Sequence, residues 1–240
     1  MKGLILCRGL TFREFDSKRR FAETLESYNN QISATLSHVK FIKHLQSQGH
    51  DIDVAFDTIQ TQHTNDLINL FEDNLKYCSL KNVMDIHTHY SLYRAVTNLE
   101  PVFYNVFYDF FVIIRNDMYL KDQFFEVFSP NDDKLKFISI TWYKHRKTPE
   151  NNPRVNDCLF FIPRRYFNVI RYLPTNAASD HHDILDIWLK EFPELEFDCY
   201  LKGYFDSNTK NDLNPFYKLV DRPEAENQDS DPNLKFPDDF

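Results

Sequence analysis

Polar side chains follow three predicted strands of this sequence, each at the point where the strand ends. They are Arg8 and Gly9 after the first strand, Asp57 and Thr58 after the second, and Arg115, Asn116 and Asp117 after the fourth. Because the carboxyl ends of parallel strands meet at one edge of a sheet, we expect these side chains to surround one cleft. Guanidinium groups match the geometry of phosphate oxygens, and carboxylates accept hydrogen bonds from a sugar or a base. The pattern therefore predicts a site for a ligand that carries both phosphates and hydroxyls.

Each candidate residue has a distinct expected role in such a site. Arg8, Arg13 or Arg115 would bind diphosphate oxygens, and Asp57 would accept hydrogen bonds from a base or a ribose. Asp117 would hold a divalent cation that bridges the diphosphate. Taken alone, each of these residues also has an ordinary structural interpretation. Asp117, for example, would cap the helix that follows it.

The elements that must position these residues alternate along the first half of the chain. Apolar residues recur at helical spacing over residues 32–48, with Asn30 as the expected cap and Gly49 as the expected end of the helix. The remaining predicted strands are 4–7, 50–58, 75–80, 110–114, 136–142 and 158–163, and the remaining predicted helices are 65–75, 91–98, 102–108, 121–128, 164–173 and 180–192. This order predicts a single α/β domain with a mostly parallel central sheet and helices on both faces.

Composition excludes several classes of protein. The 240 residues are 42% hydrophobic, which is enough for one large core, and the net charge of −8 argues against a nucleic-acid binder. The four cysteines are far apart and lie in apolar stretches, which predicts buried thiols in a reducing compartment. No segment approaches the ~20 apolar residues of a membrane span, and the apolar run near the N-terminus is too short for a signal peptide. We therefore expect a cytoplasmic protein.

The common phosphate-binding and hydrolase motifs are absent from the sequence. With only four glycines, the chain has no GxGxxG, no GxxxxGK[ST] and no GxSxG. A Rossmann dinucleotide fold, a P-loop NTPase and an α/β-hydrolase are therefore disfavoured. His181 and His182 stand at the start of a predicted helix, where a neutral imidazole would bind a metal or a phosphate. A pair of solvent-facing histidines is the alternative.

Five segments resemble those of nucleotide-sugar glycosyltransferases from large DNA viruses of algae and related giant viruses, which have a GT-A-like fold. The segments are RGLTFRE, DVAFDT, YDFFVIIRNDMYLK, PRVNDCLFFIPRRYF and YFDSNTKNDLNPFYKL, and the resemblance spans residues 4 to 223. It implies that Arg8, Gly9, Thr11 and Arg13 form the loop under the nucleotide. It also implies that Asp57 and Thr58 face the uracil or the ribose.

The segment Arg115-Asn116-Asp117 departs from the family pattern. The resemblance places it where these enzymes usually have DxD, with Asp117 as the final acidic residue and Arg115 in place of the first carboxylate. Since one carboxylate chelates a metal less well than two, a requirement for Mn²⁺ or Mg²⁺ is open, and Arg115 could itself neutralise the diphosphate.

Asp157 is the predicted general base. Glycosyl transfer with inversion needs a group that takes the proton of the acceptor hydroxyl and cationic help for the departing diphosphate. Asp157 follows a polar loop and precedes an apolar strand, and the resemblance places an acidic residue there. Trp142 and Tyr143, beside the same loop, could stack on an acceptor sugar, although core packing is the ordinary role of a tryptophan.

The resulting prediction is a glycosyltransferase that moves a sugar from a UDP- or GDP-type donor to a glycan hydroxyl. The expected domain covers residues 1–223, with a nucleotide-binding half over about 1–120 and an acceptor half over about 121–223, followed by an acidic tail at 224–240. If the protein is viral, its compartment is the host cytoplasm. Two alternatives stay open: a sugar nucleotidyltransferase, and a non-catalytic carbohydrate- or protein-binding module with a decayed donor site.

Overall fold

The computed structural model describes most of the chain and shows an alternation of strands and helices. The described residues are 1–12, 24–82, 92–98, 102, 105–140, 155–172, 184–202, 205, 210–220 and 222. Their elements are β1 (Lys2–Arg8), α1 (Leu25–Ser47), β2 (Asp51–Ile59), α2 (Thr64–Leu70), the 3₁₀ helix η1 (Glu72–Asn74), β3 (Leu75–Lys81), α3 (Leu92–Thr97), β4 (Phe110–Arg115), β5 (Met118–Leu120), α5 (Asp122–Val127), β6 (Leu135–Phe137), β7 (Leu159–Pro163), the 3₁₀ helix η4 (Arg164–Tyr172), α6 (Ile184–Glu191), β8 (Phe197–Cys199) and β9 (Tyr217–Leu219).

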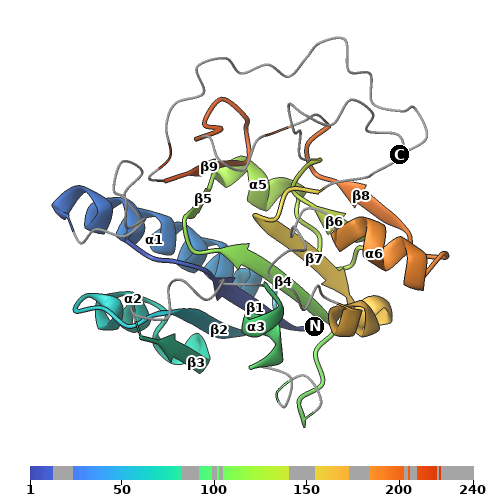
Figure 1. Ribbon diagram of the computed structural model, residues 1–240, viewed down its shortest axis with the longest axis horizontal. Helices are drawn as coiled ribbons and strands as arrows, with labels where there is room; N and C mark the ends of the chain where they lie inside the picture. Colours follow the sequence, from blue (N-terminus) through green and yellow to red (C-terminus); the bar gives the residue numbers. More distant parts are fainter. Residues whose placement is uncertain are drawn as a thin grey trace.

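The main sheet has the strand order β3-β2-β1-β4-β7-β6-β8 within the described residues (Figure 1). β1 pairs in parallel with β2 and β4, and β2 pairs in parallel with β3. β7 is antiparallel to both β4 and β6, and β6 is parallel to β8. Of these strands, only β7 therefore runs against the common direction, and its amino end lies at the carboxyl edge of the others. The predicted α/β class with a mostly parallel sheet is confirmed.

Helices cover both faces of this sheet, because alternate side chains of the central strands enter two separate cores. Ile5 and Cys7 of β1 pack in a cluster with side chains of α1, α2 and α5. Leu4 and Leu6 of the same strand pack in a second cluster with side chains of α3, η4 and α6. An uninterrupted apolar strand is what such a doubly covered sheet requires, and every residue of β4 is buried.

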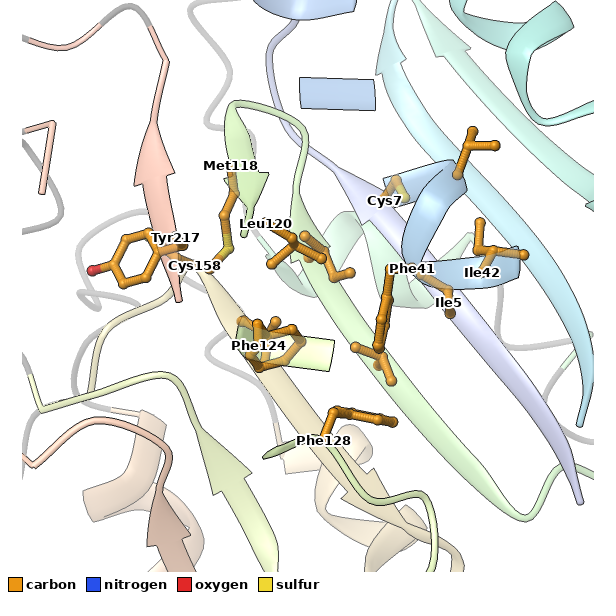
Figure 2. Packing of buried hydrophobic residues seen from close by; sticks show 14 of the residues in the cluster. Ile5, Cys7, Phe41, Ile42, Met118, Leu120, Phe124, Phe128, Cys158 and Tyr217 are labelled. Carbon is orange, nitrogen blue, oxygen red and sulfur yellow. The ribbon is translucent and has the colours of Figure 1, made fainter. Parts of the chain in front are cut away.

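The first cluster continues beyond the sheet to the short strands β5 and β9, which pair with each other as a separate ribbon. Figure 2 shows Met118 and Leu120 of β5 in the same cluster as Phe41 of α1, Tyr217 of β9 and Cys158, which immediately precedes β7. The ribbon is thus anchored on the core by its apolar side chains. This anchoring holds the turn between β4 and β5 in place.

Several predicted boundaries and helix types are wrong. Helix α1 begins at Leu25 rather than after Asn30, because the Thr24 Oγ1 caps it by accepting a hydrogen bond from the Ser27 N–H at 3.1 Å. The segment after Pro163 is a 3₁₀ helix, and β6 ends at Phe137 instead of continuing towards Trp142.

The buried state predicted for the cysteines holds for three of the four. Cys7, Cys158 and Cys199 are buried, whereas Cys78 is exposed on β3, an outer strand of the sheet. The predicted acidic tail, residues 224–240, lies outside the described residues. Within the described part of the chain, no helix combines the length and the hydropathy that crossing a bilayer would need.

Candidate functional site

Three site residues predicted from the sequence lie side by side across the sheet. Arg8, the last residue of β1, is in register with Asp57 of β2 on one side and with Arg115 of β4 on the other. The register follows from the parallel pairing, which brings the carboxyl ends of these strands to one edge. The strand ends therefore converge as the alternation of elements indicated.

The turn after β1 is fixed by backbone contacts to its neighbours. Gly9 has a φ of 109°, and a Cβ there would meet no atom within 4 Å, so it is this backbone conformation that favours glycine. The Gly9 N–H donates to the Asp57 carbonyl at 3.1 Å. The Asn116 side-chain amide donates to the carbonyls of Gly9 at 2.8 Å and Asp57 at 3.1 Å. Asn116 thus joins the turn after β4 to the ends of β1 and β2.

Arg115 is the centre of a buried ionic cluster. Its Nε and Nη2 donate to the two carboxylate oxygens of Asp117 at 2.8 and 2.6 Å, which is a bidentate pair. Its Nη1 donates to the Asp157 Oδ1 at 3.1 Å. Arg8 Nη2 donates to the Asp157 carbonyl at 2.6 Å and to its Oδ2 at 3.2 Å. Arg222 Nη2 donates to the Asp117 Oδ2 at 3.1 Å. We call these five residues the arginine–aspartate cluster.

The cluster carries more positive than negative charge. Among the described residues of the cluster, three guanidinium groups contact two carboxylates, which leaves an excess of one positive charge. Arg8, Arg115, Asp117 and Asp157 are between 2% and 8% exposed, so water screens these charges little. Buried charges are expensive unless they are paired. The excess charge therefore suits an anionic ligand.

Burial and neighbouring charges act on the arginines in opposite directions. Burial disfavours the charged form of Arg115, but Asp117, Cys158 and Asp157 together raise its pKa well above the ordinary value for arginine. For Arg222, burial lowers the pKa and the nearby Arg115 adds to this, while Asp117 raises it. Both side chains keep their charge, because an arginine is not deprotonated in a protein.

A second ionic pair lies beside the cluster. The Lys81 Nζ at the end of β3 is 3.0 Å from the Asp57 Oδ1, and both side chains are largely buried. The hydroxyls of Thr11 and Thr58 are 3.1 Å apart, and both residues are fully buried. The residues predicted to face the nucleoside therefore lie together at the ends of β1 to β3.

The predicted site residues fall partly within and partly outside the described residues. The structure brings together Arg8, Gly9, Thr11, Asp57, Thr58, Arg115, Asp117 and Asp157 at the carboxyl edge. Arg13, Trp142, Tyr143 and His182 lie outside the described residues. The helix-capping interpretation of Asp117 is wrong: this residue stands in the turn between β4 and β5, and the next helix begins at Asp122 with Lys121 as its cap.

The described residues do not fit a divalent cation at Asp117. Both of its carboxylate oxygens already accept hydrogen bonds from Arg115, and Oδ2 also accepts one from Arg222. Like charges repel, so two adjacent guanidinium groups oppose a metal ion at this position. Among the described residues, no group of three or more His, Cys, Asp or Glu side chains could hold a metal ion.

The sequence did not single out Arg222 and Lys81. Arg222 reaches the cluster because β9 pairs with β5 and the Val220 N–H donates to the Asp117 carbonyl at 2.8 Å. The apolar alternation of Tyr217 and Leu219 was the available signal for that strand. Lys81 follows the same rule as Arg8, a charged residue at the carboxyl end of a strand, and applying the rule to the third strand would have found it.

Comparison with known proteins gives matches among solved structures alone. No family model and no curated protein matches this chain. An inositol-1-phosphate CTP transferase from T. maritima is 11% identical, with a TM-score of 0.49 over 92% of this chain and 89% of its own. A Drosophila β-1,4-galactosyltransferase 7 mutant in complex with manganese, UDP-Gal and xylobiose is 11% identical, with a TM-score of 0.44 over 95% of this chain and 77% of its own.

A viral protein is also among the similar structures. It is a glycosyltransferase involved in the glycosylation of the major capsid of PBCV-1, and it is 9% identical to this chain. The TM-score is 0.40, and the match covers 87% of this chain and 82% of the viral one.

Proposed function

We propose that this protein is a glycosyltransferase that moves a sugar from a nucleoside-diphosphate sugar to a hydroxyl of a glycan acceptor, with inversion. The observation that carries the proposal is the arginine–aspartate cluster at the carboxyl edge of the parallel strands. Its excess positive charge suits a diphosphate, and this edge is where open α/β sheets bind their ligands. The resemblance of the strand-end segments to nucleotide-sugar glycosyltransferases supports the same function.

In this proposal the donor lies across the strand ends. Its nucleoside lies near Asp57 and Thr58, with Gly9 and Thr11 in the loop beneath it, and its diphosphate lies against the guanidinium groups of Arg8 and Arg115. Lys81 fixes the carboxylate of Asp57, which leaves an acceptor lone pair for a ribose hydroxyl or a base N–H. The charged residues would stabilise the negative charge that develops on the departing diphosphate.

The transfer step breaks one bond and forms one. The bond between the anomeric carbon and the diphosphate oxygen breaks, and its electron pair leaves with the nucleoside diphosphate. The acceptor oxygen forms the new bond to the anomeric carbon, and its proton goes to the proposed base, Asp157. No oxidant or reductant is needed.

The geometry adds a condition to the role of Asp157. Each of its carboxylate oxygens already accepts a hydrogen bond, Oδ1 from Arg115 and Oδ2 from Arg8. In this proposal the proton would go to one of these two oxygens, at a lone pair other than the one that faces Arg8 or Arg115. The same two arginines would then connect the base directly to the diphosphate.

Ligand-dependent melting tests the proposal. A ligand that binds only the folded state raises the melting temperature, so we expect one member of a panel of UDP-, GDP- and CMP-sugars to stabilise the protein. That sugar nucleotide should then release its nucleoside diphosphate when a glycan acceptor is added. Stabilisation by no member would favour a binding module. Release of pyrophosphate from a nucleoside triphosphate and a sugar phosphate would instead identify a nucleotidyltransferase.

A further inference from the structure

The buried arginines have donors that the protein does not use. Among the described residues, the Nε atoms of Arg8 and Arg222 are buried and meet no hydrogen-bond acceptor. A guanidinium has five N–H donors, and within the described part of the chain the acceptor that Arg222 contacts is one oxygen of Asp117. Folded proteins rarely leave buried charged donors unpaired, because their lost hydration is not replaced. Two such donors in one cluster indicate a missing acceptor.

The missing acceptor has the properties of a phosphate group. Among the described residues the cluster has one positive charge in excess, which favours an anion, and two of its arginines each have an unpaired Nε donor, which favours a ligand with several oxygens. Phosphate oxygens meet guanidinium groups in the bidentate geometry that Nε and Nη atoms provide. Among the described residues, Asp117 and Asp157 are the carboxylates that contact these arginines, and both are already engaged in the hydrogen bonds given above.

We infer that the cluster binds the diphosphate of the donor directly on Arg8, Arg115 and Arg222, without a bridging divalent cation, and that Arg222 is a donor-binding residue. This inference rests on the proposed function. Arg115 occupies the oxygens of Asp117 that a cation would need, so the guanidinium groups supply the positive charge themselves. Arg222 is held for this role by its hydrogen bond to the Asp117 carboxylate and by the nearby backbone contact of Val220 with the Asp117 carbonyl.

Calorimetric titration of the whole chain with UDP, GDP and inorganic pyrophosphate, in EDTA and in Mn²⁺, tests the inference. For the wild type, we expect the best of these ligands to bind in EDTA with a Kd within about threefold of that in Mn²⁺. Arg222→Gln should weaken that binding in EDTA by about tenfold or more, because one charged donor group is lost. The affinity of Arg222→Lys should lie between those of the wild type and Arg222→Gln, because lysine keeps the positive charge but lacks the two parallel N–H donors of a guanidinium.

Arg165→Gln is the matched control, since it also removes one arginine charge. Arg165 pairs with Glu196 at 2.6 Å on the surface and is remote from the cluster in every contact described for it. Its Kd values should equal those of the wild type. If Arg222→Gln fails to fold, Arg8→Lys replaces it, with the same expected loss of affinity.

The outcomes separate this inference from the proposed function. Binding that requires Mn²⁺, or an Arg222→Gln protein that binds as the wild type does, overturns the inference while sugar transfer could still be observed. Pyrophosphate bound in EDTA as tightly as UDP and GDP, with no sugar transferred, supports the cation-free anion site and overturns the glycosyltransferase. No binding of any of the three ligands in either buffer overturns both.

Discussion

The amino and carboxyl ends of the central parallel strands carry charges of opposite balance, with carboxylates in excess at the amino edge of the sheet and guanidinium groups in excess at the carboxyl edge, among the described residues. At the amino edge, Asp53 accepts a hydrogen bond from the Tyr108 hydroxyl at 2.8 Å and lies 3.2 Å from the Lys2 Nζ. Lys2 also faces Asp51 at 3.3 Å, and its backbone N–H donates to Asp109 at 2.7 Å. Two carboxylates therefore contact one ammonium group among the described residues, and a third accepts from the backbone of the same lysine. At the carboxyl edge, three guanidinium groups surround two carboxylates.

The difference in burial is as informative as the difference in sign. The Lys2 side chain is 35% exposed, so water compensates the charges at the amino edge, whereas the Arg115 side chain is 10% exposed. The ion pairs at the amino edge thus need no explanation beyond the solvation of charged side chains at the strand ends. At the carboxyl edge, charged side chains are buried and some of their hydrogen-bond donors are unpaired. This arrangement destabilises the folded protein by itself, but it allows the protein to bind an anion.

The largest expected difference between the edges is in turnover. Asp157→Asn should lower kcat by about 10²–10⁴-fold, because the amide cannot take the acceptor proton. Asp53→Asn, at the amino edge, should leave kcat unchanged. The measurement is release of nucleoside diphosphate from the donor found by the melting panel, with donor Kd determined separately. Wild-type kcat for Asp157→Asn would remove this residue from the role of base and leave it the role of positioning Arg8 and Arg115.

Stability should separate the edges next. Asp117→Asn leaves Arg115 and Arg222 without their shared counter-charge, so we expect a loss of about 3–5 kcal/mol in the free energy of unfolding. Asp53→Asn leaves a partly exposed ammonium and one hydroxyl, so we expect a loss of about 1–2 kcal/mol. Urea denaturation of both variants measures the difference. Equal losses would show that the carboxylates at the two edges contribute equally to the free energy of unfolding, which would contradict the comparison.

A pH-dependent effect should follow from His38, which lies behind the turn of the carboxyl edge. Its Nε2 is 2.6 Å from the Met118 carbonyl, and burial lowers its pKa to about 4, although Met118 and Asp117 act in the opposite direction. An unfolded histidine titrates near pH ~6.5, so between about pH 6.5 and 4 the unfolded chain takes up a proton that the folded chain does not. Stability should therefore fall as the pH decreases through this window, by up to about 3 kcal/mol.

The variants His38→Gln and His50→Gln assign this pH dependence. His50 lies at the amino edge, and burial lowers its pKa as well, but it is far less buried than His38. Urea denaturation at pH 7 and pH 5 should show a markedly flatter response for His38→Gln and a smaller change for His50→Gln. An unchanged response in His38→Gln would mean that other groups produce the acid sensitivity.

The smallest expected effects concern the two glycines at the ends of β1. An alanine Cβ at Gly3 would lie 2.2 Å from the fully buried Phe110 ring, so Gly3→Ala should cost about 1–3 kcal/mol by overpacking. Gly9→Ala has room for the methyl group but not the backbone conformation, and should cost about 1 kcal/mol. Nucleotide binding should weaken in Gly9→Ala alone. The reverse pattern in a titration with UDP would place the ligand at the amino edge.

The sequence predicts the ends of the central strands well and the short ribbon of β5 and β9 poorly. β1, β2 and β4 are long apolar runs, so their ends, and with them Arg8, Asp57 and Arg115, follow from the pattern. β5 and β9 have three residues each and pair across a long stretch of chain, which leaves too short a pattern to read. Arg222 arrives through that pairing and was therefore missed.

The reversal of β7 is the other feature that no local pattern encodes. Its apolar run is equally consistent with either direction, since both faces are buried. The direction is decided by its pairing with β4 and β6. The role of Asp157 as a base was predicted from the family resemblance and the preceding loop, whereas its place beside the ends of β1 and β4, in contact with Arg8 and Arg115, follows from the reversed strand.

That reversed strand also makes the cluster a late product of synthesis. Arg8 and its partner Asp157 are 149 residues apart, and Asp117 and Arg222 are 105 residues apart. A nascent chain that has completed β5 already contains Arg8, Arg115 and Asp117 but lacks Asp157 and Arg222. The complete cluster, and with it the ability to bind the ligand, would thus form only after nearly all of the described residues have been synthesised.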